Sequence, residues 1–252
     1  MAKDQPKYRG RIGLYRADIT PPERLEQTTI GREPMLSDLL EKLERSKAKK
    51  THQHYVFAGP RGVGKTHLLS LLVHRIAGSA ILNPQFTVVR FAEETHRLLS
   101  FADFLLRICE ILGHQPDHHE WQTLYQELAE EDNDKEIIDT LQPRLDHYRQ
   151  DTGRLLLLLV ENLDEILMRQ IKGKQDIHQL RNFLMTTPSC ILIATSPIVF
   201  PGLTDVRQPF YDFFDIQTLD NLTQAETVAA IRACSSPTRP RIHAVPTPPT
   251  ES

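Results

Sequence analysis

Hydrophobic and polar residues form two kinds of pattern along this chain. Short runs of aliphatic and β-branched residues predict strands, and longer segments with apolar residues at helical spacing predict helices. Residues 155–160, Leu-Leu-Leu-Leu-Leu-Val, are apolar at every position, which is typical of a strand buried on both faces of a parallel sheet. The predicted strands are 55–58, 86–91, 155–160, 190–195 and 213–218.

Helical patterns separate the predicted strands. Strands that alternate with helices indicate an α/β fold, in which a parallel sheet is flanked by helices on both faces. Thr223 is placed to cap the last helix of the series. The predicted helices outside the central region are 33–45, the segment that follows a glycine-rich loop and ends at Gly78, 176–185 and 224–232.

Residues 92–153 predict a helical insertion between two strands. Ser100 caps a first helix, which Gly113 ends. Asp117 and Glu120 give the capping signal of a second helix. A third pattern contains Pro143, so we expect a kink or a break near Gln142, because proline removes a helical hydrogen bond.

The chain divides into four predicted parts. Residues 1–28 are polar and basic, and we expect a flexible arm that is solvated rather than bound to nucleic acid. Residues 29–222 contain the alternating strands and helices of the main domain. Residues 223–233 begin one further helix, and residues 234–252 are rich in proline and predicted to be disordered.

The composition is that of a soluble protein with one large domain. With 30 Lys and Arg against 33 Asp and Glu, the 252 residues carry a net charge of −3, which argues against a protein that coats nucleic acid. Three scattered cysteines favour a reducing compartment. No apolar run is long enough for a secretory signal or a bilayer span, so we expect a cytoplasmic protein without membrane association. The histidines are interpreted as surface residues rather than a zinc site: His52, His54, His114, His118 and His119.

The most specific motif is a glycine-rich loop between the first strand and the second helix. The backbone of such a loop curls so that its N–H groups point at phosphate oxygens, and the following helix adds its dipole. Lys65 would contact the β- and γ-phosphates, and the Thr66 hydroxyl would bind Mg²⁺. We therefore predict a site for ATP and Mg²⁺. The motif G-x-x-x-x-G-K-[ST] is matched at every fixed position by Gly59, Pro60, Arg61, Gly62, Val63, Gly64, Lys65 and Thr66.

An acidic residue follows the buried strand 155–160. Glu161 would lie at the carboxyl end of this strand, and in an open α/β sheet that edge is where the phosphate loop is found. A carboxylate there can hold Mg²⁺ together with Thr66. The sequence thus predicts Thr66 and Glu161 as the metal-binding pair.

These residues together resemble a known family. The phosphate loop, the apolar strand with its acid, the strand that ends in Ala194-Thr195-Ser196 and the segment Ile30-Gly31-Arg32-Glu33 are similar to AAA+ ATPases. The resemblance covers residues 25–232 and is closest to the branch of origin-recognition-complex-like and archaeal-type ATPases and STAND NTPases. It implies a P-loop NTPase fold.

The resemblance also implies roles for single residues. Ile30 and Gly31 would contact the nucleotide base, and Glu161 would hold Mg²⁺ through water. Ser196, or else its neighbour Thr195, would be the polar sensor of the γ-phosphate. Arg207 lies where such families often place an arginine finger, but a surface arginine is the favoured interpretation.

Two features depart from this family. Its usual Asp-Glu pair is replaced by Glu161-Asn162, and an amide can orient a water but cannot accept its proton. We therefore expect slow, partner-dependent or absent hydrolysis, with Asp164, Glu93 or Glu94 as lesser candidates for the base. The family's helical lid begins at residue 223 and is then cut short by the proline-rich segment.

Three functions remain open from the sequence. The first is an ATP-dependent switch in a DNA-associated, defence or signalling assembly, acting with a protein partner or as a homo-oligomer. The second is a scaffold that binds ATP without hydrolysing it, and the third is a P-loop kinase for a small molecule. The segment Gly31-Arg32-Glu33 and the pair Glu161-Asn162 favour the first two.

Overall fold

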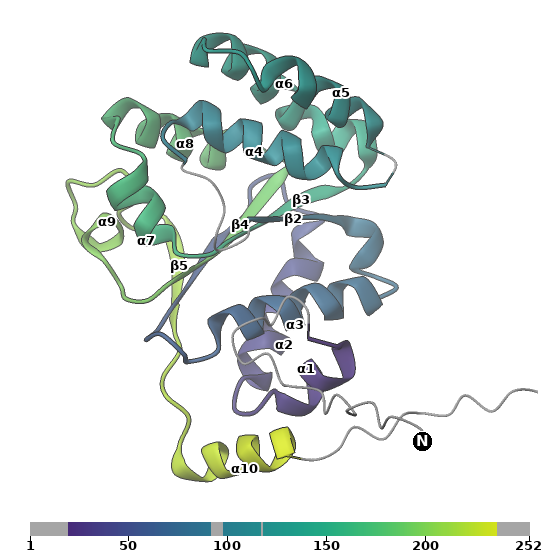
Figure 1. Ribbon diagram of the computed structural model, residues 1–252, viewed down its shortest axis with the longest axis vertical. Coiled ribbons are helices and arrows are strands. Elements are labelled where there is room, and N and C mark those ends of the chain that lie inside the picture. Colours follow the sequence, from purple (N-terminus) through teal and green to yellow (C-terminus); the bar gives the residue numbers. More distant parts are fainter. Residues whose placement is uncertain (1–19, 92–97, 117, 236–252) are drawn as a thin grey trace, which may run out of the picture.

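The computed structural model describes residues 20–91, 98–116 and 118–235. Five strands form one parallel sheet in the order β2-β3-β4-β1-β5, with the carboxyl ends of all strands at the same edge (Figure 1). The predicted α/β fold with a parallel sheet is confirmed. The strands are β1 (His54–Ala58), β2 (Phe86–Phe91), β3 (Leu155–Val160), β4 (Cys190–Ser196) and β5 (Phe214–Thr218).

Helices cover both faces of this sheet (Figure 1). One face carries α1 (Pro22–Thr28), α2 (Glu33–Ser46) and α3 (Lys65–Gly78). The other carries α4 (Phe101–Gly113), α5 (His119–Leu128), α6 (Asp134–Thr152), α7 (Leu163–Glu165) and α8 (Lys174–Thr186). The remaining elements are a 3₁₀ turn (Asn83–Gln85), a π-helical turn (Ile166–Gln170), α9 (Pro201–Thr204) and α10 (Gln224–Ser235).

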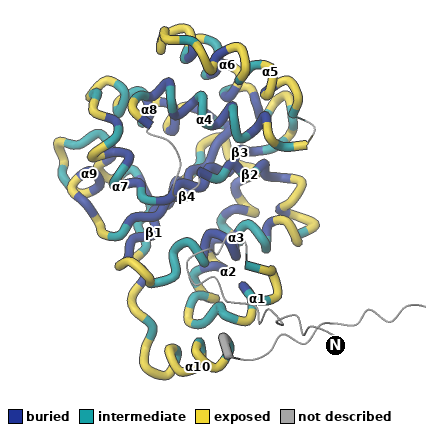
Figure 2. Tube along the Cα trace, in the orientation of Figure 1, coloured by how far each residue is buried: buried dark blue, intermediate teal, exposed yellow. Residues whose placement is uncertain are grey.

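The central strand β3 separates two hydrophobic cores. Leu156, Leu158 and Val160 pack toward α4, α6 and α8, whereas the alternating residues Leu155, Leu157 and Leu159 pack toward α1 to α3. Burial is therefore concentrated along the sheet and on the inner sides of the helices (Figure 2). This explains why the strand is apolar at every position, as predicted from its sequence.

The helical insertion follows the prediction in one part and departs from it in another. Ser100 caps α4 through a reciprocal capping box with Asp103. However, α6 runs without a break through Pro143, which is exposed, so the carbonyl that loses its partner faces solvent. Of the two expected alternatives, a break near Gln142 is therefore wrong. Asp117 lies outside the described residues.

The amino-terminal boundary of the folded domain also needs correction. Residues 22–28 form α1, which buries Leu25, so the predicted arm of residues 1–28 is shorter at its carboxyl end. Arg75 of α3 fixes this helix, because its guanidinium bonds both carboxylate oxygens of Glu26 (3.0 and 2.8 Å). The same guanidinium bonds Glu33 of α2 at 2.6 and 2.7 Å. Hydrogen bonding to Arg75 lowers the pKa of both carboxyl groups.

Several predictions concern residues that the structure does not describe. These are the arm up to residue 19, the candidate bases Glu93 and Glu94, and the proline-rich segment from residue 236 onward.

Thr223 caps α10 as expected, because its backbone N–H bonds Glu226 at 2.8 Å and its hydroxyl accepts the Glu226 N–H at 3.3 Å. None of the helices within the described ranges has the length and apolarity needed to cross a bilayer.

Candidate functional site

The glycine-rich loop connects β1 to α3 at the carboxyl edge of the sheet. Gly62 and Gly64 have φ angles of +81° and +98°, a conformation that favours glycine. Apart from its chain neighbours, no atom of the described residues lies within 4 Å of the position that a Cβ would take at either glycine, so the backbone conformation and not a lack of space favours glycine here. Gly59 is needed for close approach instead, since its Cβ would lie 2.6 Å from the carbonyl oxygen of Leu219.

The first residues of α3 bring two functional side chains to this loop. Lys65 begins the helix, and its Nζ donates to the carbonyl oxygens of Gly59 (2.6 Å) and Pro60 (3.0 Å). Its ammonium group is thereby held over the loop. Pro60 and Arg61 are exposed at the outer bend, and Val63 closes the turn through its N–H to the Pro60 carbonyl.

The Thr66 hydroxyl meets the acidic residue at the end of β3. It donates to Oε2 of Glu161 at 2.5 Å, while Oε1 of Glu161 accepts a hydrogen bond from Arg90 at 3.0 Å. Arg90 also donates to the hydroxyl of Ser70 at 3.0 Å. Only 4% of the Glu161 side chain is exposed, so the ion pair with Arg90 provides the partner that a buried carboxylate requires. The structure therefore brings together the two residues predicted to bind the metal.

Asn162 follows Glu161 in the left-handed conformation, with φ 55° and ψ 53°. Asparagine and aspartate adopt this region more readily than other residues with a side chain. The Asn162 N–H donates to Oγ1 of Thr195 on β4 at 3.4 Å. Ser196 is fully buried, and its hydroxyl donates to the carbonyl of Ile198 at 2.6 Å. The backbone carbonyl of Ser196 accepts a hydrogen bond from the Gly59 N–H at 3.1 Å, and this bond joins β4 to the start of the loop.

The segment Ile30-Gly31-Arg32 lies at the other side of the loop. Arg32 donates to the carbonyl of Val63 (3.4 Å) and to that of Asp220 (2.5 Å), so it connects the loop to the chain that leads into α10. Gly31 has a φ of +71° and lies against the Glu226 carboxylate of α10. Ile30 is half-buried beside it.

These residues fit a nucleoside triphosphate and a divalent metal ion by their chemistry. The positive φ angles of Gly62 and Gly64 and the position of Lys65 over the loop are typical of a backbone that binds phosphate through its N–H groups. The oxygens of Thr66 and Glu161 are hard ligands of the kind that Mg²⁺ prefers. Within the described ranges, neither this site nor any other contains three His, Cys, Asp or Glu residues arranged to hold a metal, so Glu161 would be assisted by the Thr66 hydroxyl and by the nucleotide.

Two arginines in this site were missed by sequence reasoning. Arg90 could have been suspected, because it is a charged residue near the end of a strand that is otherwise apolar and lies beside the strand of Glu161. Arg32 was assigned only to a family motif. The carbonyls that it contacts belong to residues 31 and 188 positions away, which no local pattern reveals.

Three other candidates are placed outside this set of contacts. Asp164 lies one turn beyond Glu161, and its buried Oδ1 has no hydrogen-bond partner within the described part of the chain. Arg207 is exposed and pairs with Asp205 at 2.7 Å, which agrees with a surface arginine. His54 is buried rather than on the surface, because its ring stacks on Phe213 at 5.2 Å and bonds backbone groups of two other elements.

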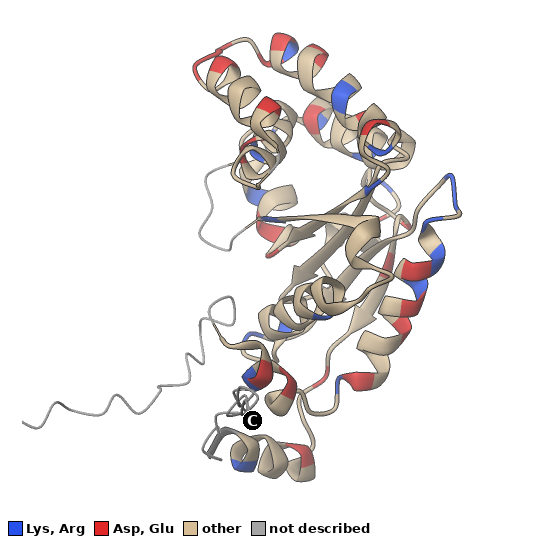
Figure 3. Cartoon of the chain, turned by 90° about the vertical axis from the view of Figure 1, so that its right-hand side faces the viewer, with Lys and Arg blue, Asp and Glu red and all other residues tan. Residues whose placement is uncertain are grey.

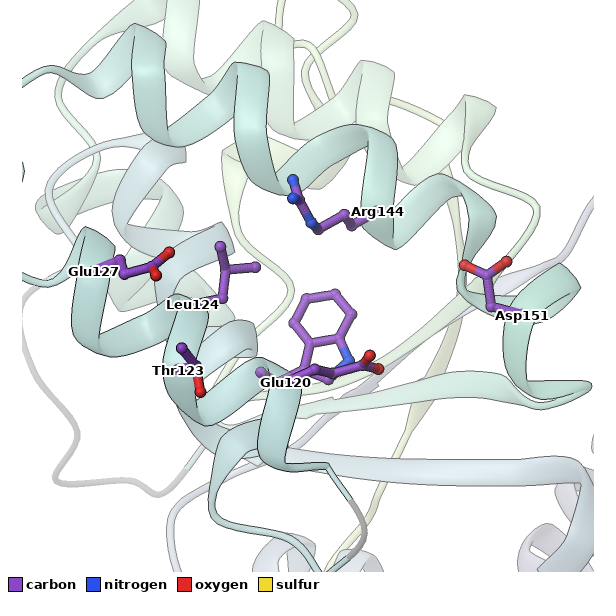
Figure 4. Close-up of a pocket in the computed structure, with 7 residues that line it drawn as sticks. Glu120, Thr123, Leu124, Glu127, Arg144 and Asp151 are labelled. Atoms are coloured by element: carbon purple, nitrogen blue, oxygen red, sulfur yellow. The ribbon is translucent and has the colours of Figure 1, made fainter.

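A separate cleft lies between α5 and α6 (Figure 4). It has a volume of about 540 Å³, and its side chains come from the helical insertion rather than from the glycine loop or the strand ends. It is therefore distinct from the candidate nucleotide site. The lining residues are Glu120, Trp121, Thr123, Leu124, Glu127, Arg144 and Asp151.

Comparison with known proteins identifies the class to which this fold and this loop belong. Residues 45–200 match a family described as AAA domain. Because the match covers more than half of the chain, the protein belongs to the AAA+ P-loop ATPases. The resemblance inferred from the phosphate loop and strand ends is thus confirmed. No curated protein sequence matches the chain significantly.

Solved structures with a similar fold include two ORC proteins and one Cdc6 protein. ORC1 of Aeropyrum pernix in complex with DNA matches 81% of this chain with a TM-score of 0.59 and 14% identity. ORC2 of the same organism, in ADPNP–ADP complexes, matches 81% with a TM-score of 0.53 and 16% identity, and Cdc6p of Pyrobaculum aerophilum matches 85% with 0.51 and 12%. The chain spans about half the length of these proteins, 49%, 52% and 54% respectively. At these identities the similarity establishes the fold.

Proposed function

We propose that this protein binds ATP and Mg²⁺ in the glycine loop and acts as a nucleotide-dependent switch with slow or partner-stimulated hydrolysis. The observation that carries the proposal is the Thr66–Glu161 contact, which places a hydroxyl and a carboxylate side by side at the first turn of α3. Backbone N–H groups of Arg61, Gly62, Gly64, Lys65 and Thr66 would bind the phosphates. The Lys65 side chain would leave its carbonyl partners for the β- and γ-phosphates.

The metal ion and the adenine base of the nucleotide would contact different parts of the site. Thr66 and Glu161 would hold Mg²⁺, which supplies charge stabilisation to the phosphates when bound. Ile30 and Gly31 would lie against the adenine, next to the start of α10. Gly31 lies against the Glu226 carboxylate of α10, so a base bound at Gly31 would also come close to α10.

Slow hydrolysis follows from the chemistry of Asn162. Its amide can orient an attacking water but cannot accept the proton at neutral pH. Ser196 would sense the γ-phosphate from the end of β4. Asp164 is an alternative base, since its Oδ1 is buried and has no hydrogen-bond partner among the residues that the structure describes.

The conformation of Asn162 decides which variant tests this proposal. Glutamate would be strained at a φ of 55°, whereas aspartate tolerates this region and restores a carboxylate. We expect wild-type phosphate release on the order of 10⁻³ s⁻¹ or slower without a partner, and an increase of at least about tenfold in Asn162→Asp.

Asn133→Asp is the matched control, because Asn133 caps α6 far from the loop and aspartate caps equally well. Its phosphate release should equal that of the wild type. Fast wild-type hydrolysis that Asn162→Asp leaves unchanged would contradict the assignment of Asn162. Bound ATP with no phosphate release in either protein would instead favour a scaffold that does not hydrolyse ATP, a function that Asn162 also supports.

The assembly in which the switch works is a further part of the proposal. We infer action with a protein partner or as a homo-oligomer, and DNA association is a candidate because the matched ORC1 of Aeropyrum pernix is in complex with DNA. The helices at the top of the molecule in Figure 3, α5 and α6, are rich in acidic residues and should face away from DNA. Fluorescence anisotropy with duplex DNA, with and without ATP, tests this association.

A further inference from the structure

Arg90 is a largely buried cation at the carboxyl end of β2. Its Nη2 donates to Oε1 of Glu161 and its Nη1 to the Ser70 hydroxyl, both at 3.0 Å. The side chains of Arg90 and Glu161 are 22% and 4% exposed. Charges with so little exposure are only weakly screened by solvent and salt, so each acts strongly on nearby ionic groups.

Four side chains form a connected hydrogen-bonded set from α3 through β3 to β2. Thr66 and Ser70 are four residues apart on α3 and therefore lie on the same face of the helix. Thr66 bonds one oxygen of the Glu161 carboxylate, and Arg90, which is bonded to Ser70, holds the other. The guanidinium is thus separated from the Thr66 hydroxyl only by this carboxylate.

The charge on Glu161 creates a conflict with the proposed ligand. A triphosphate in the glycine loop is strongly anionic, and an uncompensated carboxylate beside Thr66 would repel it. A metal ion between the two removes this repulsion. Arg90 provides a second source of positive charge, which belongs to the protein itself and is already bonded to the carboxylate.

We propose that Arg90 is a positioning residue that acts as a permanent countercharge: it orients the Glu161 carboxylate and cancels its charge, so that the loop binds nucleotide with little dependence on Mg²⁺. This inference rests on the proposed nucleotide-binding function. A purely structural role, in which Arg90 only joins α3 to β3, would weaken nucleotide binding equally with and without metal.

The test measures the dissociation constant of a fluorescent ATP analogue for the full chain, once in EDTA and once in saturating Mg²⁺. For the wild type, the two constants should differ by less than about tenfold. Arg90→Gln should weaken binding by about 30-fold or more in EDTA but by less than about threefold in Mg²⁺. Arg90→Lys keeps the charge, so its constants should stay within about threefold of the wild type in both buffers.

Arg154→Gln is the matched control, because Arg154 bonds Thr87 at the opposite end of β2. It should leave both constants unchanged. A second variant guards against misfolding of Arg90→Gln: the double substitution Arg90→Gln/Glu161→Gln removes both charges with little change of shape. In EDTA its constant should return to within about threefold of the wild type, because no carboxylate is left unpaired.

Two results with the variants, and one with the wild type, would overturn the inference. One is an equal loss of affinity in EDTA and Mg²⁺ for Arg90→Gln, and the other is a double variant that binds as weakly in EDTA as the single variant. Wild-type binding that requires Mg²⁺ would also contradict it. If the folded wild type binds no nucleotide in either buffer, the proposed function itself fails, and this inference fails with it.

Discussion

At the carboxyl edge of the sheet Arg90 is bonded to a carboxylate, whereas at the amino edge Arg154 is bonded to main-chain carbonyls. Arg154 donates to Oγ1 of Thr87 at 3.0 Å and to the carbonyls of Asn83 (2.8 Å) and Phe86. The carbonyls bonded to Arg154 lie at the edge opposite the glycine loop, so they should keep this partner whether or not a ligand is bound. A carboxylate such as Glu161 can exchange a partner for a metal ion, so only the carboxyl edge can respond to a ligand.

His54 and the glycine loop, at opposite ends of β1, show the same contrast. Nδ1 of His54 accepts the Leu192 N–H at 2.9 Å, and its Nε2–H donates to the Leu184 carbonyl at 2.8 Å. Gly62 and Gly64, in contrast, leave open space. The contacts at the amino edge thus stabilise the fold, whereas the carboxyl edge carries the candidate nucleotide site. Substitutions at the amino edge should reduce stability without affecting nucleotide binding, whereas substitutions at the carboxyl edge should weaken nucleotide binding.

The largest expected effect is that of His54→Ala. It removes a buried ring stacked on Phe213 and leaves two backbone groups without partners, so we expect a loss of about 3–4 kcal/mol in the free energy of unfolding. Urea denaturation measures this loss. His119→Ala, at an exposed position, should stay within about 0.5 kcal/mol of the wild type. ATP affinity should not change in either variant, and a stable His54→Ala would contradict the assignment.

Acidification should act on the same residue. Burial lowers the pKa of His54 from 6.5 to about 4, so the folded state keeps the ring neutral while the unfolded chain binds a proton below pH 6.5. The stabilising contribution is therefore present above pH 6.5 and is lost as the pH falls toward 4, by on the order of 3 kcal/mol. The free energy of unfolding, measured between pH 7 and pH 5, should show the beginning of this loss. Ordinary carboxyl groups titrate below that range and should contribute little to it. His54→Gln, which keeps a donor and an acceptor but does not titrate, should flatten this dependence; an unchanged slope would exclude His54 as the cause.

Gly64→Ala tests the carboxyl edge. Alanine at a φ of +98° is strained by about 1–2 kcal/mol, and relief of this strain would turn backbone N–H groups away from the phosphates. We expect ATP binding to weaken by about tenfold. Gly78→Ala is the control, because Gly78 ends α3 with open space around it and without a positive φ. Equal ATP affinity of both variants would show that the loop geometry is not needed.

The smallest effect is expected for Arg154→Gln. Loss of its bonds to Thr87 and to two carbonyls should cost about 1 kcal/mol in the free energy of unfolding, because solvent can replace part of them. Thermal denaturation measures this change. A change in ATP affinity without a change in stability would break the comparison between the two edges.

The features that were predicted correctly are those encoded by contiguous residues. The strand 155–160 was recognised because both of its faces are buried, and α4 was recognised from its cap and its helical spacing. The glycine-rich loop between β1 and α3 could be located because all of its fixed positions lie within eight residues; its binding of phosphate stays a prediction.

The features that were missed depend on contacts distant in sequence. Helix α1 is short and largely polar, and it is held by the packing of Leu25 and by Arg75, which lies about 50 positions from its partner Glu26. Helix α6 continues through Pro143 because that residue is exposed and its neighbours on the inner face are buried. The pairing of Arg90 with Glu161 joins two strands that are adjacent only in the folded sheet.

The most direct test of the central claim is calorimetric titration of the folded protein with ATP and Mg²⁺, in parallel with Lys65→Ala and with Lys50→Ala as an exposed control. The account predicts saturable binding of one nucleotide per chain to the wild type and to Lys50→Ala. It predicts a loss of at least about 100-fold in affinity for Lys65→Ala, because a charge-assisted contact to phosphate disappears. Absence of binding to the wild type, or equal affinity of Lys65→Ala, would contradict it.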